Sequence, residues 1–197
     1  MDNAANGPWW FRHTPPLIDK AALRAALRAR RRAFAADGPT PPAPPALFLN
    51  ALRPGVIVAS YVPMGGEADP GAFDRAARAA GAVLAWPLVV DRVSPITFHT
   101  GAPASDGPFG LRQPAADSAP VAPAIILTPL VGFDPACNRL GQGAGHYDRA
   151  FAALPDAMKI GIAWSVQQVA RLPRDPWDVA LDAIVTETDL FLPGEKL

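Results

Sequence analysis

The residues from Arg139 to Arg149, RLGQGAGHYDR, have the composition of a loop that binds an anion. Glycines at positions 141, 143 and 145 leave the backbone nearly free of side chains, so its N–H groups can turn towards one ligand. The apolar run Ala150 to Leu154 predicts a helix directly after the loop. The unpaired N–H groups and the dipole at the start of a helix favour phosphate, so the sequence predicts a phosphate-binding loop.

The loop matches neither common nucleotide-binding motif. A P-loop needs Lys followed by Ser or Thr after its glycines, and the dinucleotide motif G-x-G-x-x-G needs its third glycine one residue later than it stands here. The run Ile125 to Phe133 predicts a buried strand upstream, and strand, glycine loop and helix is the usual order in a nucleotide-phosphate site. The alternative is a tight glycine turn that packs strand on helix and binds nothing.

The longer stretch from Gly132 to Leu154 resembles the signature of the 5-formyltetrahydrofolate cyclo-ligases, also called methenyltetrahydrofolate synthetases. The residues that carry the match are Phe133-Asp134, Arg139-Leu140-Gly141, Gly143, Gly145 and Tyr147-Asp148-Arg149. Asp19 to Arg24, Tyr61 to Glu67, Phe109 to Pro114 and Lys159 to Glu187 follow the family's order. The chain departs from the family at Cys137, Ala144 and His146, at Gln113 (usually glutamate) and at Trp177 (usually histidine).

The resemblance implies ATP-dependent cyclisation of 5-formyltetrahydrofolate to 5,10-methenyltetrahydrofolate, with release of ADP and phosphate. A phosphorylated formyl oxygen becomes a good leaving group, so the protein has to bring the γ-phosphate and that oxygen into line. One alternative is a related protein that keeps the nucleotide site but acts on another substrate or only binds folate. A second is a noncatalytic interaction module of the same fold.

By this resemblance, the nucleotide site combines the glycine loop with the start of the first helix. Lys20, Arg24 and Arg139 can balance the triphosphate charge. Because Mg²⁺ prefers carboxylate and phosphate oxygens, Asp148 is the first candidate metal ligand and Asp178 the second. The residues expected to bind ATP, the cosubstrate, are Lys20, Arg24, Arg139, Leu140, Gly141, Gln142, Gly143, Ala144, Gly145, His146 and Tyr147.

The candidate catalytic residues are Arg139, Tyr147 and Asp148. Tyr147 can hydrogen-bond the formyl group or a phosphate, and its alternative role is a ring packed under the loop. Glu67 is expected to accept from pterin N–H donors, and its alternative role is an acid at the start of a helix near Pro70. The residues expected to bind folate are Val62, Glu67, Gln142, Gly145 and His146, with Met64 as a further apolar contact.

Hydrophobic patterning predicts the elements that position these residues. Helices are expected over Leu17–Ala36 and Pro70–Ala80, and strands over Val56–Val62, Val83–Val90, Ile96–His99, Ile125–Phe133, Ile160–Trp164 and Ala183–Thr186. Residues 39–45 read as a stiff spacer and 101–123 as a long surface loop. Lys20, Arg24, Arg28 and Arg31 share one helix face, and we interpret Arg28 and Arg31 as its solvated part.

Strands that alternate with helices predict an α/β fold with a mainly parallel sheet. Ligands of such sheets lie beyond the carboxyl ends of the strands, which places Glu67, the glycine loop and the segment after Trp164 at one edge. The resemblance implies a Rossmann-like three-layer sandwich. We expect one domain over residues 17–197, after a flexible leader over residues 1–16.

Composition argues against several classes of protein. The formal net charge of zero over 197 residues is atypical of a nucleic-acid binder. The single cysteine, Cys137, permits no internal disulfide, and no apolar run approaches the length of a membrane span. We therefore expect a cytoplasmic monomer without an export signal, whose partners are ATP, Mg²⁺ and a reduced folate.

Overall fold

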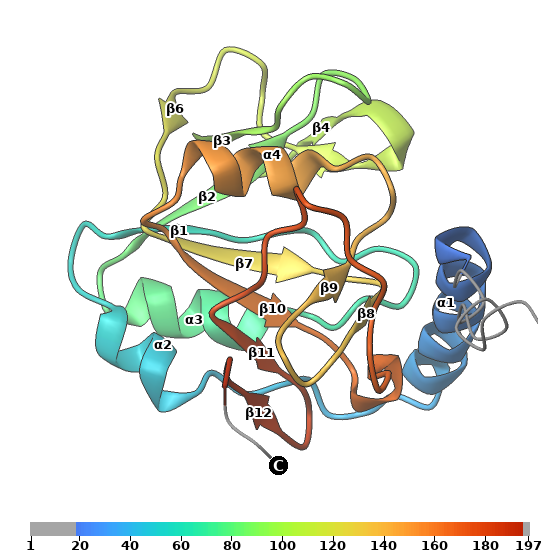
Figure 1. Ribbon diagram of the computed structural model, residues 1–197. Coiled ribbons are helices and arrows are strands. Elements are labelled where there is room, and N and C mark those ends of the chain that lie inside the picture. Colours follow the sequence, from blue (N-terminus) through green and yellow to red (C-terminus); the bar gives the residue numbers. More distant parts are fainter. Residues whose placement is uncertain (1–18, 195–197) are drawn as a thin grey trace, which may run out of the picture.

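A computed structural model, which describes residues 19–194, contains an eight-stranded sheet in the order β12-β11-β10-β7-β1-β2-β3-β6 (Figure 1). The five central strands are mutually parallel: β11 (Ala183–Val185), β10 (Met158–Ile162), β7 (Ile125–Pro129), β1 (Ile57–Ala59) and β2 (Val83–Leu88). The outer strands are antiparallel to their neighbours: β12 (Leu190–Phe191), β3 (Thr97–Thr100) and β6 (Pro120–Val121). The predicted mainly parallel α/β fold is confirmed.

Helices cover both faces of the sheet, which gives three layers. In Figure 1, α4 (His146–Ala153) lies above the sheet, and α2 (Ala46–Ala51) and α3 (Gly71–Ala79) lie below it. Strand β1 serves both faces, because Val58 packs with the residues of α2 and α3 and Ala59 packs with those of α4. Burial on both faces explains why β7 is a nearly continuous apolar run.

The first helix, α1 (Lys20–Ala36), lies beside the sheet at the end where the strands finish (Figure 1). Asp19 caps it by accepting a hydrogen bond from the Ala21 N–H at 2.8 Å. Leu27 is buried against Val131, Leu140 and Leu172, so α1 is anchored by its own small core. This core fixes the helix next to the glycine loop. The leader predicted over residues 1–16 lies outside the described residues.

The strand predicted over Ile125–Phe133 is wrong in its second half. Strand β7 stops at Pro129, and β8 (Gly132–Phe133) pairs instead with β9 (Arg139–Leu140) in a separate hairpin. The Leu130 carbonyl leaves the sheet to accept from Gln167 and Arg31 side chains, at 2.7 and 3.1 Å. The glycine loop therefore follows β9 rather than a strand of the main sheet.

Other elements also differ from the prediction, among them β1, which ends at Ala59 instead of Val62, and β10, which spans Met158–Ile162 instead of Ile160–Trp164. The surface loop expected over residues 101–123 contains β4 (Ser105–Asp106), the 3-10 helix η2 (Pro108–Gly110), β5 (Arg112–Gln113) and edge strand β6. Helix α2 was not predicted, because six residues after a proline-rich segment show too little periodicity. Helix α4 begins at His146, four residues before the apolar run that predicted it, because the first turn of a helix often carries polar residues.

Candidate active site

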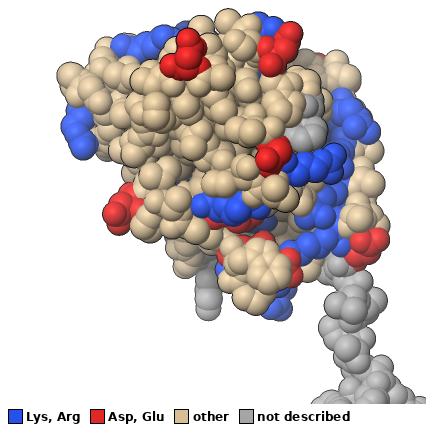
Figure 2. Space-filling model, turned by 90° about the horizontal axis from the view of Figure 1, so that it is seen from above, with Lys and Arg blue, Asp and Glu red and all other residues tan. Residues whose placement is uncertain are grey.

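The candidate site lies where the carboxyl ends of the central strands meet α1 and the glycine loop. The segment after β1 supplies Glu67, the segment after β7 supplies the Leu130 carbonyl, and the 3-10 helix η3 (Ser165–Gln167) after β10 supplies Gln167. Glu67, the glycine loop and the segment after Trp164 were predicted to lie at one edge of the sheet. Gln142 Nε2 of the loop donates to Glu67 at 3.1 Å, and Trp164 Nε1 donates to the Gly66 carbonyl at 2.9 Å, which agrees with that prediction. Seen from above Figure 1, Lys and Arg side chains gather along the side of the molecule on which α1 lies (Figure 2).

The glycine loop is held by arginines that donate to its carbonyl groups. Arg24 Nε donates to the Gly141 carbonyl at 2.9 Å, and Arg149 Nη1 donates to the Ala144 carbonyl at 2.9 Å. Gly143 and Gly145 have φ of 109° and 68°, a backbone conformation that residues other than glycine rarely adopt. With its carbonyl groups engaged by these cations, the loop lies directly on the basic face of α1.

The interpretation of Arg31 as part of a solvated face is wrong, whereas Arg28 is half-buried and its contacts lie at the surface. Arg31 is 3% exposed, and its guanidinium donates to the Glu67 carboxylate at 3.2 Å and to the carbonyls of Leu130 and Gly65 at 3.1 and 3.2 Å. Arg28 donates to the Gln142 side-chain oxygen at 3.0 and 2.7 Å. A signal was present in the sequence, because Arg31 falls four residues after buried Leu27, on the apolar stripe of the helix.

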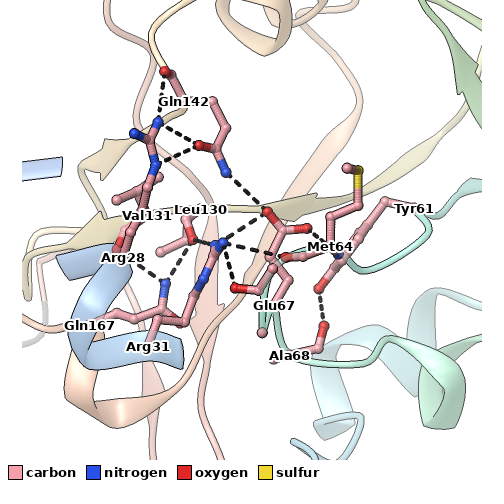
Figure 3. Close-up of polar contacts among 12 residues, drawn as sticks. Arg28, Arg31, Tyr61, Met64, Glu67, Ala68, Leu130, Val131, Gln142 and Gln167 are labelled. Carbon is pink, nitrogen blue, oxygen red and sulfur yellow. Dashed lines mark hydrogen bonds and ion pairs between the residues drawn. The ribbon is translucent and has the colours of Figure 1, made fainter. Parts of the chain in front are cut away.

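Glu67 is a buried acceptor that is already partly engaged (Figure 3). Its Oε1 accepts from Arg31 and from Gln142 Nε2 at 3.1 Å, and its Oε2 accepts from the Met64 N–H at 3.1 Å. Burial raises the pKa of Glu67, and the nearby Arg31 acts in the opposite direction. The alternative role at a helix start belongs to Asp69, which accepts from the Gly71 N–H at 2.8 Å.

Two tyrosines lie near this carboxylate. Burial raises the pKa of Tyr61 and that of Tyr147, and the charge of Glu67 raises both further. The Tyr61 hydroxyl donates to the Ala68 carbonyl at 2.6 Å. The Tyr147 ring packs against the core, and its centroid lies 5.8 Å from the Cζ of Arg139. Both phenols stay protonated at neutral pH and can donate hydrogen bonds.

Arg139 and Asp148 form an ion pair at the base of the loop. Arg139 Nη2 lies 2.6 Å from Asp148 Oδ1, and the Arg139 side chain is only 4% exposed. Burial lowers the pKa of the Arg139 guanidinium, and the Asp148 charge opposes that shift. The guanidinium also lies 5.0 Å from the Phe151 ring centroid. Arg139 is thus a structural support of the loop as well as a candidate phosphate contact.

Lys20 connects α1 to the segment that contains Asp178. Its Nζ lies 2.7 Å from Asp175 Oδ2 and 3.1 Å from Asp178 Oδ2. Burial alone lowers the pKa of Lys20, but the hydrogen bonds and charges of the two aspartates outweigh it, so the pKa is raised. The Val179 N–H approaches Asp148 Oδ1 at 3.5 Å, which places this segment beside the Arg139–Asp148 pair.

The two predicted metal ligands lie in neighbouring segments with an oxygen donor set that suits Mg²⁺. Between residues 19 and 194, the hydrogen bonds in this structure engage Oδ1 of Asp148 and Oδ2 of Asp178, so each carboxylate keeps its second oxygen for a ligand. The same residues contain no group of three or more His, Cys, Asp or Glu side chains that could hold a metal. Two carboxylates, together with phosphate oxygens and water, would give Mg²⁺ the oxygen ligands that it prefers.

The remaining predicted residues contact the site in different ways. The Leu140 side chain is buried in the core that anchors α1, and its carbonyl accepts from the Val131 N–H at 2.8 Å. His146 Nε2 lies 3.2 Å from the Arg92 carbonyl, and half-buried Val62 packs beside the core. Gly145, at the N-cap of α4, accepts from the Arg149 N–H at 3.1 Å. These contacts place all four residues around the loop or the segment that carries Glu67.

Three further residues that were compared with the family lie outside the predicted site. Asp134 accepts the backbone N–H groups of Ala136, Asn138 and Leu172 and so supports the turn before β9. Trp177, where the family usually has histidine, is 69% exposed. Gln113, where the family usually has glutamate, accepts from the Val89 N–H at 3.0 Å, so it supports the end of β2.

Among residues 19–194, no helix is both long and apolar enough to cross a membrane.

Comparison with known proteins agrees with this geometry. The 5-formyltetrahydrofolate cyclo-ligase of Haemophilus influenzae is 39% identical over 85 residues, which cover 40% of this chain and 46% of that protein. The enzyme of the same name from Mycolicibacterium smegmatis is 29% identical over 151 residues, 71% of this chain and 78% of that protein. The alignments with the Haemophilus influenzae and Escherichia coli K12 relatives thus span less than half of each relative's length.

Solved structures give a longer match. The 5,10-methenyltetrahydrofolate synthetase of Aquifex aeolicus is 26% identical with a TM-score of 0.65, and the match covers 90% of this chain and 94% of that one. The synthetase of Mycoplasma pneumoniae is 25% identical with a TM-score of 0.63, covering 86% and 99%. The model of the 5-formyltetrahydrofolate cyclo-ligase family matches residues 17–187. With its glycine loop, its basic helix and its sheet in place, this chain belongs to the 5-formyltetrahydrofolate cyclo-ligase family.

Proposed function

We propose that this protein uses ATP to close 5-formyltetrahydrofolate into 5,10-methenyltetrahydrofolate, releasing ADP and phosphate. One observation carries the proposal beyond family membership. The glycine loop lies between a basic helix face and a buried carboxylate, and Gln142 in that loop contacts both, at 2.7 Å to Arg28 and 3.1 Å to Glu67. An anion on the loop and a ligand on Glu67 would therefore be neighbours, as transfer of a phosphoryl group between them requires.

The nucleotide half of the site consists of the loop and the cations around it. Arg24 and Lys20 of α1 lie along the loop and the Asp178 segment, where they can exchange their present partners for phosphate oxygens. Arg139 supports the loop from below and contributes positive charge to the same region. Asp148 and Asp178 would hold Mg²⁺, which neutralises charge on the phosphates when it is bound.

The folate half of the site is built around Glu67. A buried carboxylate attracts the N–H donors of a pterin ring more strongly than an exposed one, because less water competes for it. Val62 and Met64 offer apolar surface beside it, and both side chains are half-buried. Tyr147 remains a neutral phenol near Glu67 and can donate a hydrogen bond to a formyl or phosphoryl oxygen.

The proposed chemistry proceeds in two steps. The formyl oxygen attacks the γ-phosphorus and the bond to ADP breaks. The N10 nitrogen of the folate then attacks the activated formyl carbon, loses its proton, and phosphate leaves with the electrons of the carbon–oxygen bond. The protein's contribution is to hold the two reactants in line and to compensate the charge on the phosphoryl oxygens.

The test is to mix the protein with ATP, Mg²⁺ and 5-formyltetrahydrofolate and to follow the absorbance of the methenyl product together with ADP. We expect one ADP for each methenyl group formed, and no product when ATP is omitted. ATP hydrolysis that is independent of 5-formyltetrahydrofolate would instead support the related protein with another substrate. Absence of both reactions, with folded protein, would contradict the enzymatic assignment.

A further inference from the structure

The Glu67 carboxylate has little acceptor capacity left for a ligand (Figure 3). A carboxylate offers about four lone-pair sites. Three are used in this structure, by Arg31 and Gln142 on Oε1 and by the Met64 N–H on Oε2. The pterin ring of a folate presents an amino group and an adjacent ring N–H as a pair of donors. Two acceptor sites are therefore needed where about one remains, so one of the three present donors has to leave.

Only one of these donors can leave at small cost. Arg31 is buried, and it also donates to the carbonyls of Leu130 and Gly65. Removing it from Glu67 would leave a buried charge without its partner. The Met64 N–H belongs to the backbone of the segment that carries Glu67 itself. Gln142, in contrast, is exposed, and its contact with Glu67 lies at the surface.

We propose that Gln142 is a specificity residue of the folate site, whose side-chain amide competes with the pterin ring for Glu67. In the free protein the amide donates to Oε1, and the ring has to displace it to place both of its donors. A ligand with a single donor finds only the remaining site on Oε2 and leaves the Gln142 contact intact. The site thus selects ligands that present two adjacent donors, because these alone repay the lost contact. This inference rests on the assignment of Glu67 to the pterin.

Arg28 sets the position from which Gln142 competes. Its guanidinium donates to the Gln142 side-chain oxygen at 3.0 and 2.7 Å and to the Gln142 backbone carbonyl at 3.2 Å. With its oxygen held in this way, the amide has only its NH₂ group directed at Glu67 (Figure 3). The polar orientation of the side chain is therefore fixed by α1, and the amide acts as a donor that imitates one N–H of the ligand.

The test compares the affinity of the unmodified protein and of Gln142→Met for 5-formyltetrahydrofolate by calorimetry, without nucleotide. Methionine keeps the length of the side chain and removes its donor. Because a net hydrogen bond is lost from the free protein only, we expect binding about 2–10-fold tighter in the variant. Unchanged or weaker binding would overturn the proposal, and weaker binding would identify Gln142 as a direct contact of the folate.

Two further variants make the result specific. Arg30→Ala changes an exposed residue of α1 and should leave folate affinity unchanged, which controls for an unspecific effect of substitution. In a Glu67→Gln background, the effect of Gln142→Met should become smaller, because an uncharged amide oxygen accepts more weakly than the carboxylate for which the two groups compete. A full effect of Gln142→Met in that background would overturn the competition.

The same set separates this inference from the proposed function. If Glu67→Gln leaves folate binding unchanged, the assignment of Glu67 to the pterin fails. If Glu67→Gln weakens binding and Gln142→Met does not strengthen it, the assignment stands and the competition by Gln142 fails. Thermal melting of each variant confirms that the protein compared is folded.

Discussion

Two basic residues of α1 form ion pairs with other parts of the protein, and these pairs differ in their exposure to water. At the start of the helix, Lys20 pairs with Asp175 and Asp178, and these side chains are 22%, 43% and 23% exposed. About three turns later, Arg31 pairs with Glu67, and these side chains are 4% and 8% exposed. Charges in partial contact with water can change partners at low cost, whereas separating a buried pair leaves a charge without solvent.

This difference matches the parts that the two pairs have in the proposed site. On the nucleotide side, cations and carboxylates have to exchange each other for phosphate and Mg²⁺, so weak pairs are suited to the task. On the folate side, the carboxylate has to stay in one position and accept a ligand, so a strong buried pair is suited to it. The comparison can be tested by breaking each pair.

The largest expected effect is on stability. Arg31→Ala should lower the free energy of unfolding by about 3–5 kcal/mol, because it leaves Glu67 buried without its partner. Lys20→Ala should lower it by about 1 kcal/mol or less, because its pair is partly exposed. Urea unfolding of both variants gives the two values. Equal losses of unfolding free energy would show that the exposure of the ion pairs does not determine how much they contribute to stability.

The next effect concerns folate binding. Glu67→Gln keeps the size of the side chain and removes its charge, so the hydrogen bonds to pterin donors lose about 1.5–3 kcal/mol, or roughly 10–100-fold in affinity. ATP affinity should change little, because the nucleotide contacts lie on the other side of Gln142. Calorimetry with the folate and with ATP measures the two affinities separately. Folate affinity within about twofold of the parent's would remove Glu67 from the substrate site.

On the nucleotide side, Asp148→Asn tests the proposed metal ligand. We expect the variant to lose most of the stabilisation that ATP with Mg²⁺ gives the parent, about 2.7 kcal/mol when the ligand is at 100 times its dissociation constant. Thermal melting with and without the nucleotide–metal pair measures this. Because Asp148 also pairs with Arg139, the apo variant should itself melt lower, and the comparison has to be made relative to each apo protein.

If ATP and Mg²⁺ stabilise the Asp148→Asn variant as much as they stabilise the parent, Asp148 supports Arg139 and binds no metal. Asp178→Asn is the matched variant, since Asp178 is the second predicted ligand and pairs with the more exposed Lys20.

The smallest effect is a pH dependence of folate affinity. Burial raises the pKa of Glu67 above its ordinary value of 4.5, and Arg31 acts in the opposite direction. The ionised carboxylate is the better acceptor, so affinity should be constant above the raised pKa and fall as the pH drops through it. Tyr61 and Tyr147, which also face Glu67, stay neutral over this range. Affinity measured from pH 7 down to about pH 5 should show the fall in the parent and not in Glu67→Gln.

The stability contribution of Glu67 has the opposite sign. A carboxyl group whose pKa is raised by folding favours the folded state in its protonated form, so this contribution is present below pH 4.5 and is lost as the pH rises through the folded pKa. The free energies of unfolding of the parent and of Glu67→Gln should therefore approach each other as the pH falls, because the protonated carboxyl group resembles the uncharged amide. A pH-independent difference between them would contradict the raised pKa.

Much of the fold and of the loop could be predicted because the determining interactions are local. Glycines at 143 and 145 take positive φ, and α4 follows them directly, as the spacing of the run indicates. The central strands are apolar because both faces of the sheet are covered, and this marks them in the sequence. The breaks after Pro129 and within residues 101–123 were missed because hairpins of two-residue strands have no detectable periodicity.

The sequence by itself determined the alternation of strands and helices, the glycine loop at a helix start, and the carboxylates and cations available to it. Only the tertiary structure decided which groups the buried Arg31 contacts, that β9 rather than the main sheet leads into the loop, and that Glu67 is already bonded by Arg31 and Gln142. Glu67 lies 36 and 75 positions from these two partners along the chain. Contacts at such separations depend on how α1 docks against the ends of the strands. The apolar stripe of α1 indicates that Leu27 is buried, but it does not indicate that Leu27 packs against Val131, Leu140 and Leu172.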